Sequence, residues 1–250
     1  MARVLGDTKA MQDFGALSAE AGQFYALTYY AHAAIGFGAA LLGTVALASR
    51  KGGIQHRRAG QVFLLAMTFA ALSALYFVAA RVPAPPVVIS ALAALYGMGM
   101  AILSLKPRKG GAKALQAALI AIPVLIGLLY LSYLAFALMV PDVPFYIGFV
   151  GSLAGAVFLA MAWSDIQFMR AKTVEPGRRQ RRHGFRMALV MAEVVRAPLQ
   201  SFGPPFLGEE HSFQFYAFAP MLLIPVFYYL ARPSWLRPGS NGGPAAAASA

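Results

Sequence analysis

The stretch LQAALIAIPVLIGLLYLSYLAFALM, residues 115–139, decides the solvent in which this chain folds. It contains no charged side chain, and a helix of this length, at about 1.5 Å per residue, crosses the roughly 30 Å of hydrocarbon in a bilayer. Of the 250 residues, 59% are hydrophobic and only 12% are charged, too few to cover the surface of a water-soluble protein. The sequence therefore predicts an all-α, polytopic transmembrane helix bundle.

Seven apolar stretches are long enough to span a bilayer, and short basic or Pro/Gly-rich segments separate them. We place them at about 24–48, 61–80, 86–105, 115–139, 144–168, 185–203 and 213–231. The sixth stretch differs because it carries Glu193, Arg196 and Pro198. It is either a full span or a broken, re-entrant helix, which a membrane protein tolerates only where protein or water satisfies the backbone.

Basic residues alternate between the segments that connect these stretches. Most of the 21 Lys and Arg residues lie in the first, third and fifth connections and after the last stretch, whereas the other connections hold only Arg81. Because basic connections stay in the cytoplasm, we expect the N-terminus outside and the C-terminus in the cytoplasm. The chain then divides into an extracytoplasmic segment (1–23), a transmembrane bundle (24–232) and a cytoplasmic, disordered tail (233–250).

The net charge of +12 follows from this topology. No recognition motif accompanies the basic residues, so we expect no nucleic-acid partner. The expected partners are the lipid bilayer and its anionic headgroups, which basic residues near the inner ends of the spans would contact. The arginines in those positions are Arg57, Arg58, Arg178, Arg179, Arg181 and Arg182. A larger membrane complex or a homodimer is a further partner that the sequence leaves open.

Two glycine-rich stretches space small residues as closely packed membrane helices do. They are GFGAALLG (36–43) and GFVGSLAG (148–155). We expect these stretches to pack against other helices of the same chain. A dimer interface is the alternative interpretation.

The sequence lacks the motifs of the common enzyme classes. Without cysteine, the chain has no disulfide, thiolate metal site, cysteine nucleophile or covalently attached haem. There is no P-loop, dinucleotide fingerprint, G-x-S-x-G elbow or HExxH motif, and no His/Glu spacing on one helix suits zinc. We therefore predict no catalytic residue and no metal site; a non-enzymatic protein is the leading interpretation, and whether the protein is an enzyme stays open.

Three polar residues inside the spans suggest a site. His32 and Arg196 lie at similar depths, roughly 10–12 Å below the outer ends of their helices. Glu193 lies one turn from Arg196 on the same helix face. Because charges inside a bilayer usually face protein or water, we predict an intramembrane polar site of His32, Glu193 and Arg196. The alternative is a polar clamp that fixes helix positions and binds nothing. We interpret Asp165, near an inner helix end, as an interfacial residue or a partner of the basic loop.

The histidines allow a different hypothesis. His32 and His211 lie toward the outer side and His56 and His183 toward the inner side. Two such pairs could ligate two b-type haems stacked across the membrane. Only His32 lies well inside a span; the other three also suit headgroup contacts, helix caps or a solvated loop. The sequence does not itself require a cofactor, and haem b is the alternative.

Several segments resemble a known family. They are YAHAAIGFGAALLGTVAL (30–47), RKGGIQHRRAGQVFLLAMTFAALSALY (50–76), SDIQFMRAKTVEPGRRQRRHGFRMALVMAEVVRAP (164–198) and FYAFAPMLLIPVFYYLARPSW (215–235). Together they are similar to a bacterial family of multi-pass membrane proteins designated domain of unknown function 2306. The matching features are a histidine in the first helix (His32), an HRRxG entry to the second (His56 to Gly60) and a basic loop with a histidine opening a later helix (His183).

The resemblance implies a multi-helix fold and a bacterial inner (cytoplasmic) membrane location, and it implies no activity. Family members continue the last motif with small and hydroxyl residues, whereas this chain has Glu193 and Arg196 there. The charged pair therefore departs from the family pattern. Our leading interpretation is a non-enzymatic accessory or small-ligand/lipid-binding bundle. A b-type haem or quinone-linked redox protein is the alternative, and a transporter is the third.

Overall fold

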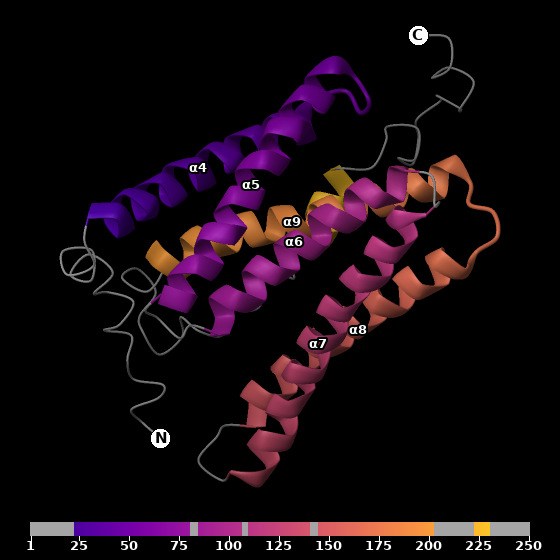
Figure 1. The fold of residues 1–250 in the computed structure, drawn as a ribbon. Helices are drawn as coiled ribbons and strands as arrows, with labels where there is room; N and C mark the ends of the chain where they lie inside the picture. The colour runs from indigo at the N-terminus through magenta and orange to yellow at the C-terminus, as the bar shows by residue number, and fades with distance from the viewer. Residues whose placement is uncertain (1–22, 81–84, 107–109, 141–144, 203–222, 231–250) are drawn as a thin grey trace.

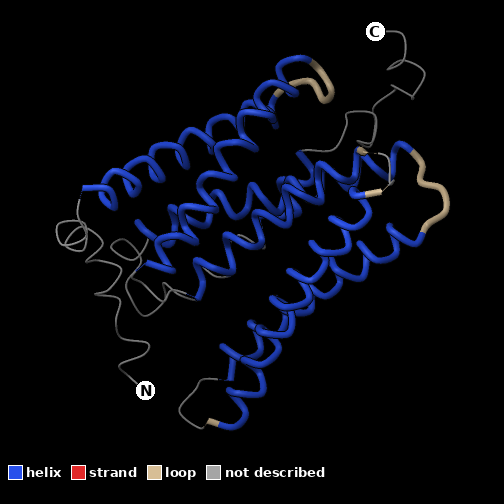
Figure 2. Tube along the Cα trace, viewed as in Figure 1, coloured by secondary structure: helices blue, strands red, loops and turns tan. Residues whose placement is uncertain are grey.

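The computed structural model describes residues 23–80, 85–106, 110–140, 145–202 and 223–230. Its long helices, in chain order, are α4 (Gln23–Ala48), α5 (Ile54–Ala80), α6 (Pro85–Leu105), α7 (Gly111–Met139), α8 (Phe145–Arg170) and α9 (Pro176–Phe202). A shorter helical segment covers residues 223–230. The described residues contain no strand (Figure 2), so the predicted all-α class is confirmed.

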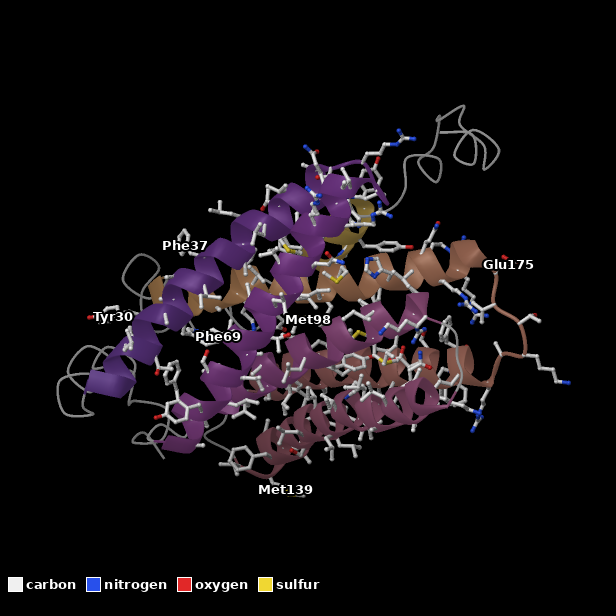
Figure 3. All side chains as sticks on the ribbon, turned by 45° about the horizontal axis from the view of Figure 1, so that its top comes forward. Tyr30, Phe37, Phe69, Met98, Met139 and Glu175 are labelled. Carbon is white, nitrogen blue, oxygen red and sulfur yellow. The ribbon has the colours of Figure 1, made fainter. Side chains whose placement is uncertain are left out.

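Five helices are long and apolar enough to cross a membrane. The qualifying segments are Leu27–Ala48, Ile54–Ala79, Val87–Leu105, Gly111–Met139 and Gly151–Arg170, which overlap the first five predicted spans. Large apolar side chains on these helices face away from the protein. Tyr30, Phe37 and Met139 point outward in Figure 3, and Met139 is 80% exposed, whereas Met98 lies between helices. The chain therefore has the helices and the outer surface of an integral membrane protein.

The structure describes nearly all of the sixth predicted span but only part of the seventh. The stretch 185–203 lies almost entirely within α9, which stays helical through Pro198 to Phe202 and so shows no break there. The first turns of α9 are strongly basic, and α9 is not among the five apolar helices. The stretch 213–231 lies largely outside the described residues, apart from the helical segment 223–230. A total of seven spans thus stays a prediction.

Consecutive helices run in opposite directions (Figure 1). The C-terminal ends of α4, α6 and α8 and the N-terminal ends of α5, α7 and α9 lie toward one end of the bundle, and their other ends lie toward the opposite end. The basic residues Lys51, Lys106 and Lys172 follow the C-terminal ends of α4, α6 and α8 and so lie toward the first of these ends. The fold therefore places these basic connections together, as the positive-inside rule requires of a membrane protein.

Helices α6 and α9 form the centre of the bundle, because both contribute to each of two apolar clusters. One cluster joins them to α4 and α5 through residues that include Phe63, Met98 and Met191. The other joins them to α7, α8 and the segment 223–230. Any polar side chain on the inner faces of α6 or α9 is consequently surrounded by other helices.

The α7–α8 hairpin depends on close backbone approach at two glycines. A Cβ atom added to Gly155 would lie 2.7 Å from the backbone oxygen of Gly127 and 3.1 Å from Cβ of Tyr130. Gly43 of α4 similarly packs against Phe63 and Met191. The predicted packing of the glycine-rich stretches within the chain is therefore confirmed at Gly155 and Gly43, while Gly36 has open space around its Cα.

Candidate functional site

Buried charges lie along one face of α9. Arg182, Arg186, Glu193 and Arg196 are separated by four, seven and three residues. Because an α-helix turns once every 3.6 residues or so, these spacings keep all four side chains on one stripe. We call this set the α9 charged stripe. It contains an inner half, near the basic connections, and an outer half.

The inner half of the stripe surrounds a buried carboxylate from α8. Asp165 is 0% exposed, and its Oδ1 accepts a hydrogen bond of 2.6 Å from Nη2 of Arg186. Arg182 forms an ion pair with the same oxygen. The hydroxyl of Tyr96, on α6, donates to Oδ2 of Asp165. We call Tyr96, Asp165, Arg182 and Arg186 the inner polar cluster; it joins three helices.

This geometry bears on two interpretations from the sequence. Asp165 pairs with two arginines that follow the basic loop, as one of the two interpretations expected, and its side chain is enclosed within the bundle. Arg182 belongs to the arginines expected at lipid headgroups, yet its side chain is only 9% exposed and its guanidinium pairs with Asp165. The physical reason is that a buried carboxylate attracts the nearest cations out of the headgroup layer.

Aromatic rings and backbone oxygens compensate part of the cost of burying the two arginines. The guanidinium carbon of Arg186 lies 5.2 Å from the ring centre of Tyr96, and that of Arg182 lies 4.4 Å from the ring centre of Phe168. Arg186 Nη2 also donates to the carbonyl of Met161 at 3.2 Å. These contacts hold the side chains in place without adding a negative charge.

The inner polar cluster has more positive charge than negative. Two guanidinium groups share one carboxylate, and both approach the same oxygen of Asp165. Burial lowers the pKa of Arg182, which precedes the expected span, and the charge of Arg186 lowers that pKa further. Nε and Nη1 of Arg186, which is only 1% exposed, have no hydrogen-bond partner among the described residues. An unpaired, buried N–H group on a cation is costly.

The outer half of the stripe is a simple ion pair. Nε of Arg196 donates to Oε2 of Glu193 at 2.8 Å, and Arg196 is only 3% exposed. The pairing expected from their three-residue spacing is therefore present. It is electrically neutral, unlike the inner polar cluster.

His32 contacts α5 and not the outer ion pair. Its Nδ1 lies 2.7 Å from the hydroxyl oxygen of Ser73, and its ring lies edge-on to Phe77 at 5.5 Å between centres. The structure thus brings Glu193 and Arg196 together, whereas the contacts of His32 are with Ser73 and Phe77 of α5. The three-residue site expected from the sequence is not assembled as one cluster by these contacts.

Two further histidines join helix ends at the basic side of the bundle. Nδ1 of His56 lies 2.9 Å from the carbonyl oxygen of Ala46, and Nδ1 of His183 lies 3.1 Å from that of Ala101. Each imidazole therefore fixes the last turns of a neighbouring helix, α4 or α6, instead of capping the start of its own. His211 lies outside the described residues.

The remaining arginines proposed for headgroup contact occupy the surface of the same end. Arg57, Arg58, Arg178 and Arg181 are exposed, and Arg179 is half-buried, donating to the carbonyl of Lys106 at 3.4 Å. Exposed basic side chains that flank membrane helices are expected to reach the headgroup layer, so lipid contact by these arginines stays a prediction. In the described part of the chain, no group of three or more metal-ligating side chains comes together.

Comparisons with family models, with curated proteins and with solved structures give no match to this chain. The candidate site therefore rests on the geometry of the described residues. That geometry identifies Tyr96, Asp165 and Arg186, which sequence reasoning did not combine. The available signal was the four-residue spacing of Arg182 and Arg186, which continues the stripe of Glu193 and Arg196.

Proposed function

We propose that this protein is a non-enzymatic membrane protein that binds a small ligand or a lipid at a polar site inside its helix bundle. The uneven charge of the inner polar cluster is the observation that supports the proposal. We further propose a place in a bacterial inner membrane with the N-terminus outside, an orientation that the alternating basic connections support.

The alternative of a polar clamp explains only half of the α9 charged stripe. A clamp needs each charge to be matched, because an unmatched charge inside a bilayer is expensive. Glu193 and Arg196 meet this condition, because the two charges of their ion pair cancel. Arg182 and Arg186 do not, since Asp165 is their one ion-pair partner among the described residues. A ligand that brings negative charge would complete the inner polar cluster.

The direct test is to detect what the protein carries. The full chain would be purified in a mild detergent and analysed by native mass spectrometry, alone and as Arg186→Gln. Arg181→Gln is the matched control, because Arg181 is an exposed arginine on the same helix. We expect the wild type and Arg181→Gln to retain a bound small molecule or lipid that Arg186→Gln loses. A wild type with no bound species, or equal retention in all three, contradicts the proposal.

One observation favours the haem alternative as a second candidate. Nδ1 of His56 and of His183 contacts a carbonyl oxygen, which leaves Nε2 of each ring as the atom that can ligate iron. The test is the visible absorption spectrum of protein made in cells supplied with haem, oxidised and then reduced with dithionite. A Soret band that is lost in His183→Ala supports a cytochrome. A colourless protein excludes it.

A further inference from the structure

We propose that the ligand of the inner polar cluster is a phosphate oxyanion, bound by the guanidinium groups of Arg182 and Arg186. This inference rests on the proposed ligand-binding function and names the chemistry of the ligand. The phosphate can come from a phospholipid headgroup or from a soluble phosphate compound, and the chemistry of recognition is the same for both.

The unused hydrogen-bond donors define what the ligand must supply. Arg186 uses Nη2 for Asp165 and Met161, so Nε and Nη1 are left as buried donors. Nε of Arg182 is also buried without a partner in the described part of the chain. A guanidinium group presents its N–H donors in a planar fork that fits two oxygens of one phosphate. The ligand should therefore offer several acceptor oxygens in a compact group.

The charge of the cluster sets the charge of the ligand. Two guanidinium groups and one carboxylate give an excess of one positive charge, and Tyr96 and the backbone contacts leave that excess unchanged. A group with one negative charge, such as a phosphodiester or a singly protonated phosphate ester, would neutralise it. An uncharged or cationic ligand would leave the excess buried, which is unfavourable in a bilayer.

The position of the cluster gives such an anion a route of entry. Asp165 is five residues from the end of α8 at Arg170, or roughly 8 Å along the helix axis. The exposed Arg178 lies between that end of the bundle and the cluster, one turn before Arg182 on the same stripe of α9. Successive arginines create a positive potential that attracts an anion toward Arg182, the more exposed of the two binding groups.

Arg182 is the residue that can change partner when the anion binds. Arg182 and Arg186 compete for the same oxygen of Asp165, and Tyr96 donates to the other oxygen. If Arg182 turns to the phosphate, Asp165 keeps Arg186 and Tyr96, so the carboxylate is never left alone. Binding then relieves the repulsion between the two guanidinium groups.

The experiment measures thermal stability of the purified full chain in a phosphate-free maltoside detergent. One series adds inorganic phosphate and compares it with potassium chloride at equal ionic strength. A second series adds short-chain phosphatidylglycerol and compares it with an uncharged glycolipid. Stabilisation by inorganic phosphate identifies a soluble source, and stabilisation by the phospholipid alone identifies a headgroup. In either series, we expect Arg186→Gln to weaken the apparent affinity at least about tenfold, and Arg181→Gln to leave it unchanged.

Arg182→Lys covers the case in which Arg186→Gln does not fold. It keeps the positive charge beside Asp165 but loses the planar fork, so we expect weaker phosphate binding at a smaller loss of stability than in Arg186→Gln. If neither phosphate probe stabilises the wild type although native mass spectrometry finds a bound species, the phosphate inference is wrong and ligand binding stands. If no species is bound and neither probe acts, both proposals fail.

Discussion

Asp165 is the residue on which the inner polar cluster depends. It is the carboxylate that both Arg182 and Arg186 contact, and it lies in the bundle interior. We expect Asp165→Asn to lower the free energy of unfolding by about 3–5 kcal/mol, because it leaves two buried cations without a counter-charge. Tyr96→Phe, which removes one hydrogen bond, should cost only about 1–3 kcal/mol. Thermal and denaturant unfolding in detergent measure both changes, and equal costs would contradict this ranking.

The ion pair of Glu193 and Arg196 gives a second prediction about single residues. Glu193→Gln removes a negative partner of the buried Arg196 guanidinium, so we expect a loss of about 3 kcal/mol in the free energy of unfolding. The double variant Glu193→Gln with Arg196→Gln removes both charges and should recover much of that loss. A double-mutant cycle of unfolding measures the difference. If the single variant is as stable as the wild type, the pair contributes nothing.

His183 gives the protein a predicted dependence on pH. Burial lowers the pKa of His183 below its ordinary value of 6.5, and the contact with Ala101 opposes this only in part. A lowered pKa means that the folded protein binds the proton less readily than the unfolded chain does. The contribution of neutral His183 to the free energy of unfolding is therefore fully present above a pH of about 6.5, and it decreases as the pH falls below that value. We expect His183→Gln to lose less stability than the wild type between pH 7.5 and pH 5.

At the scale of helices, hydropathy locates the apolar parts well and the ends poorly. The stretch 115–139 corresponds to α7, Gly111–Met139, but α5 starts at Ile54 and α9 at Pro176, well before the predicted 61 and 185. The reason is that a membrane helix continues into the headgroup layer, where basic side chains are favourable and hydropathy is low. Proline at the start of α9 fits the first turn, which needs no N–H donor.

The two halves of the α9 charged stripe differ in how well they can be predicted from the sequence. The pair of Glu193 and Arg196 is local, three residues apart on one helix, so it could be predicted from spacing alone. The inner polar cluster requires Tyr96, Asp165 and Arg186 from three helices to meet. No local pattern specifies such a meeting, because it depends on how α8 packs against α6 and α9.

The α7–α8 interface offers a prediction about elements. Because a Cβ atom at Gly155 would lie 2.7 Å from a backbone oxygen of α7, Gly155→Ala must push the two helices apart. We expect a loss of about 1–3 kcal/mol in unfolding free energy. Gly36→Ala is the matched control, since its added Cβ meets open space and alanine favours a helix. Equal stability of the two variants would show that the close approach is unimportant.

In the molecule as a whole, the membrane topology of the chain determines which side of the membrane the inner polar cluster faces. Helix α9 starts at the end of the bundle where α4, α6 and α8 end (Figure 1), and its first turns carry the exposed arginines and then Arg182 and Arg186 of the inner polar cluster. If that end is cytoplasmic, a phosphate ligand reaches the cluster from the cytoplasm or from the inner leaflet. The orientation of the protein in the membrane therefore decides from which side of the membrane an anion can reach the inner polar cluster.

The absence of cysteine makes that orientation directly measurable, because each introduced cysteine is the only one in the chain. Lys172→Cys lies in the α8–α9 connection, and Met139→Cys lies at the opposite end of the bundle, at the last residue of α7. A membrane-impermeant maleimide should label Met139→Cys in right-side-out spheroplasts and Lys172→Cys only in inverted vesicles, because basic connections are retained inside. Opposite labelling would invert the predicted orientation and move the entry route of the anion to the outer side. Labelling of both cysteines from one side would mean that α8 does not cross the membrane.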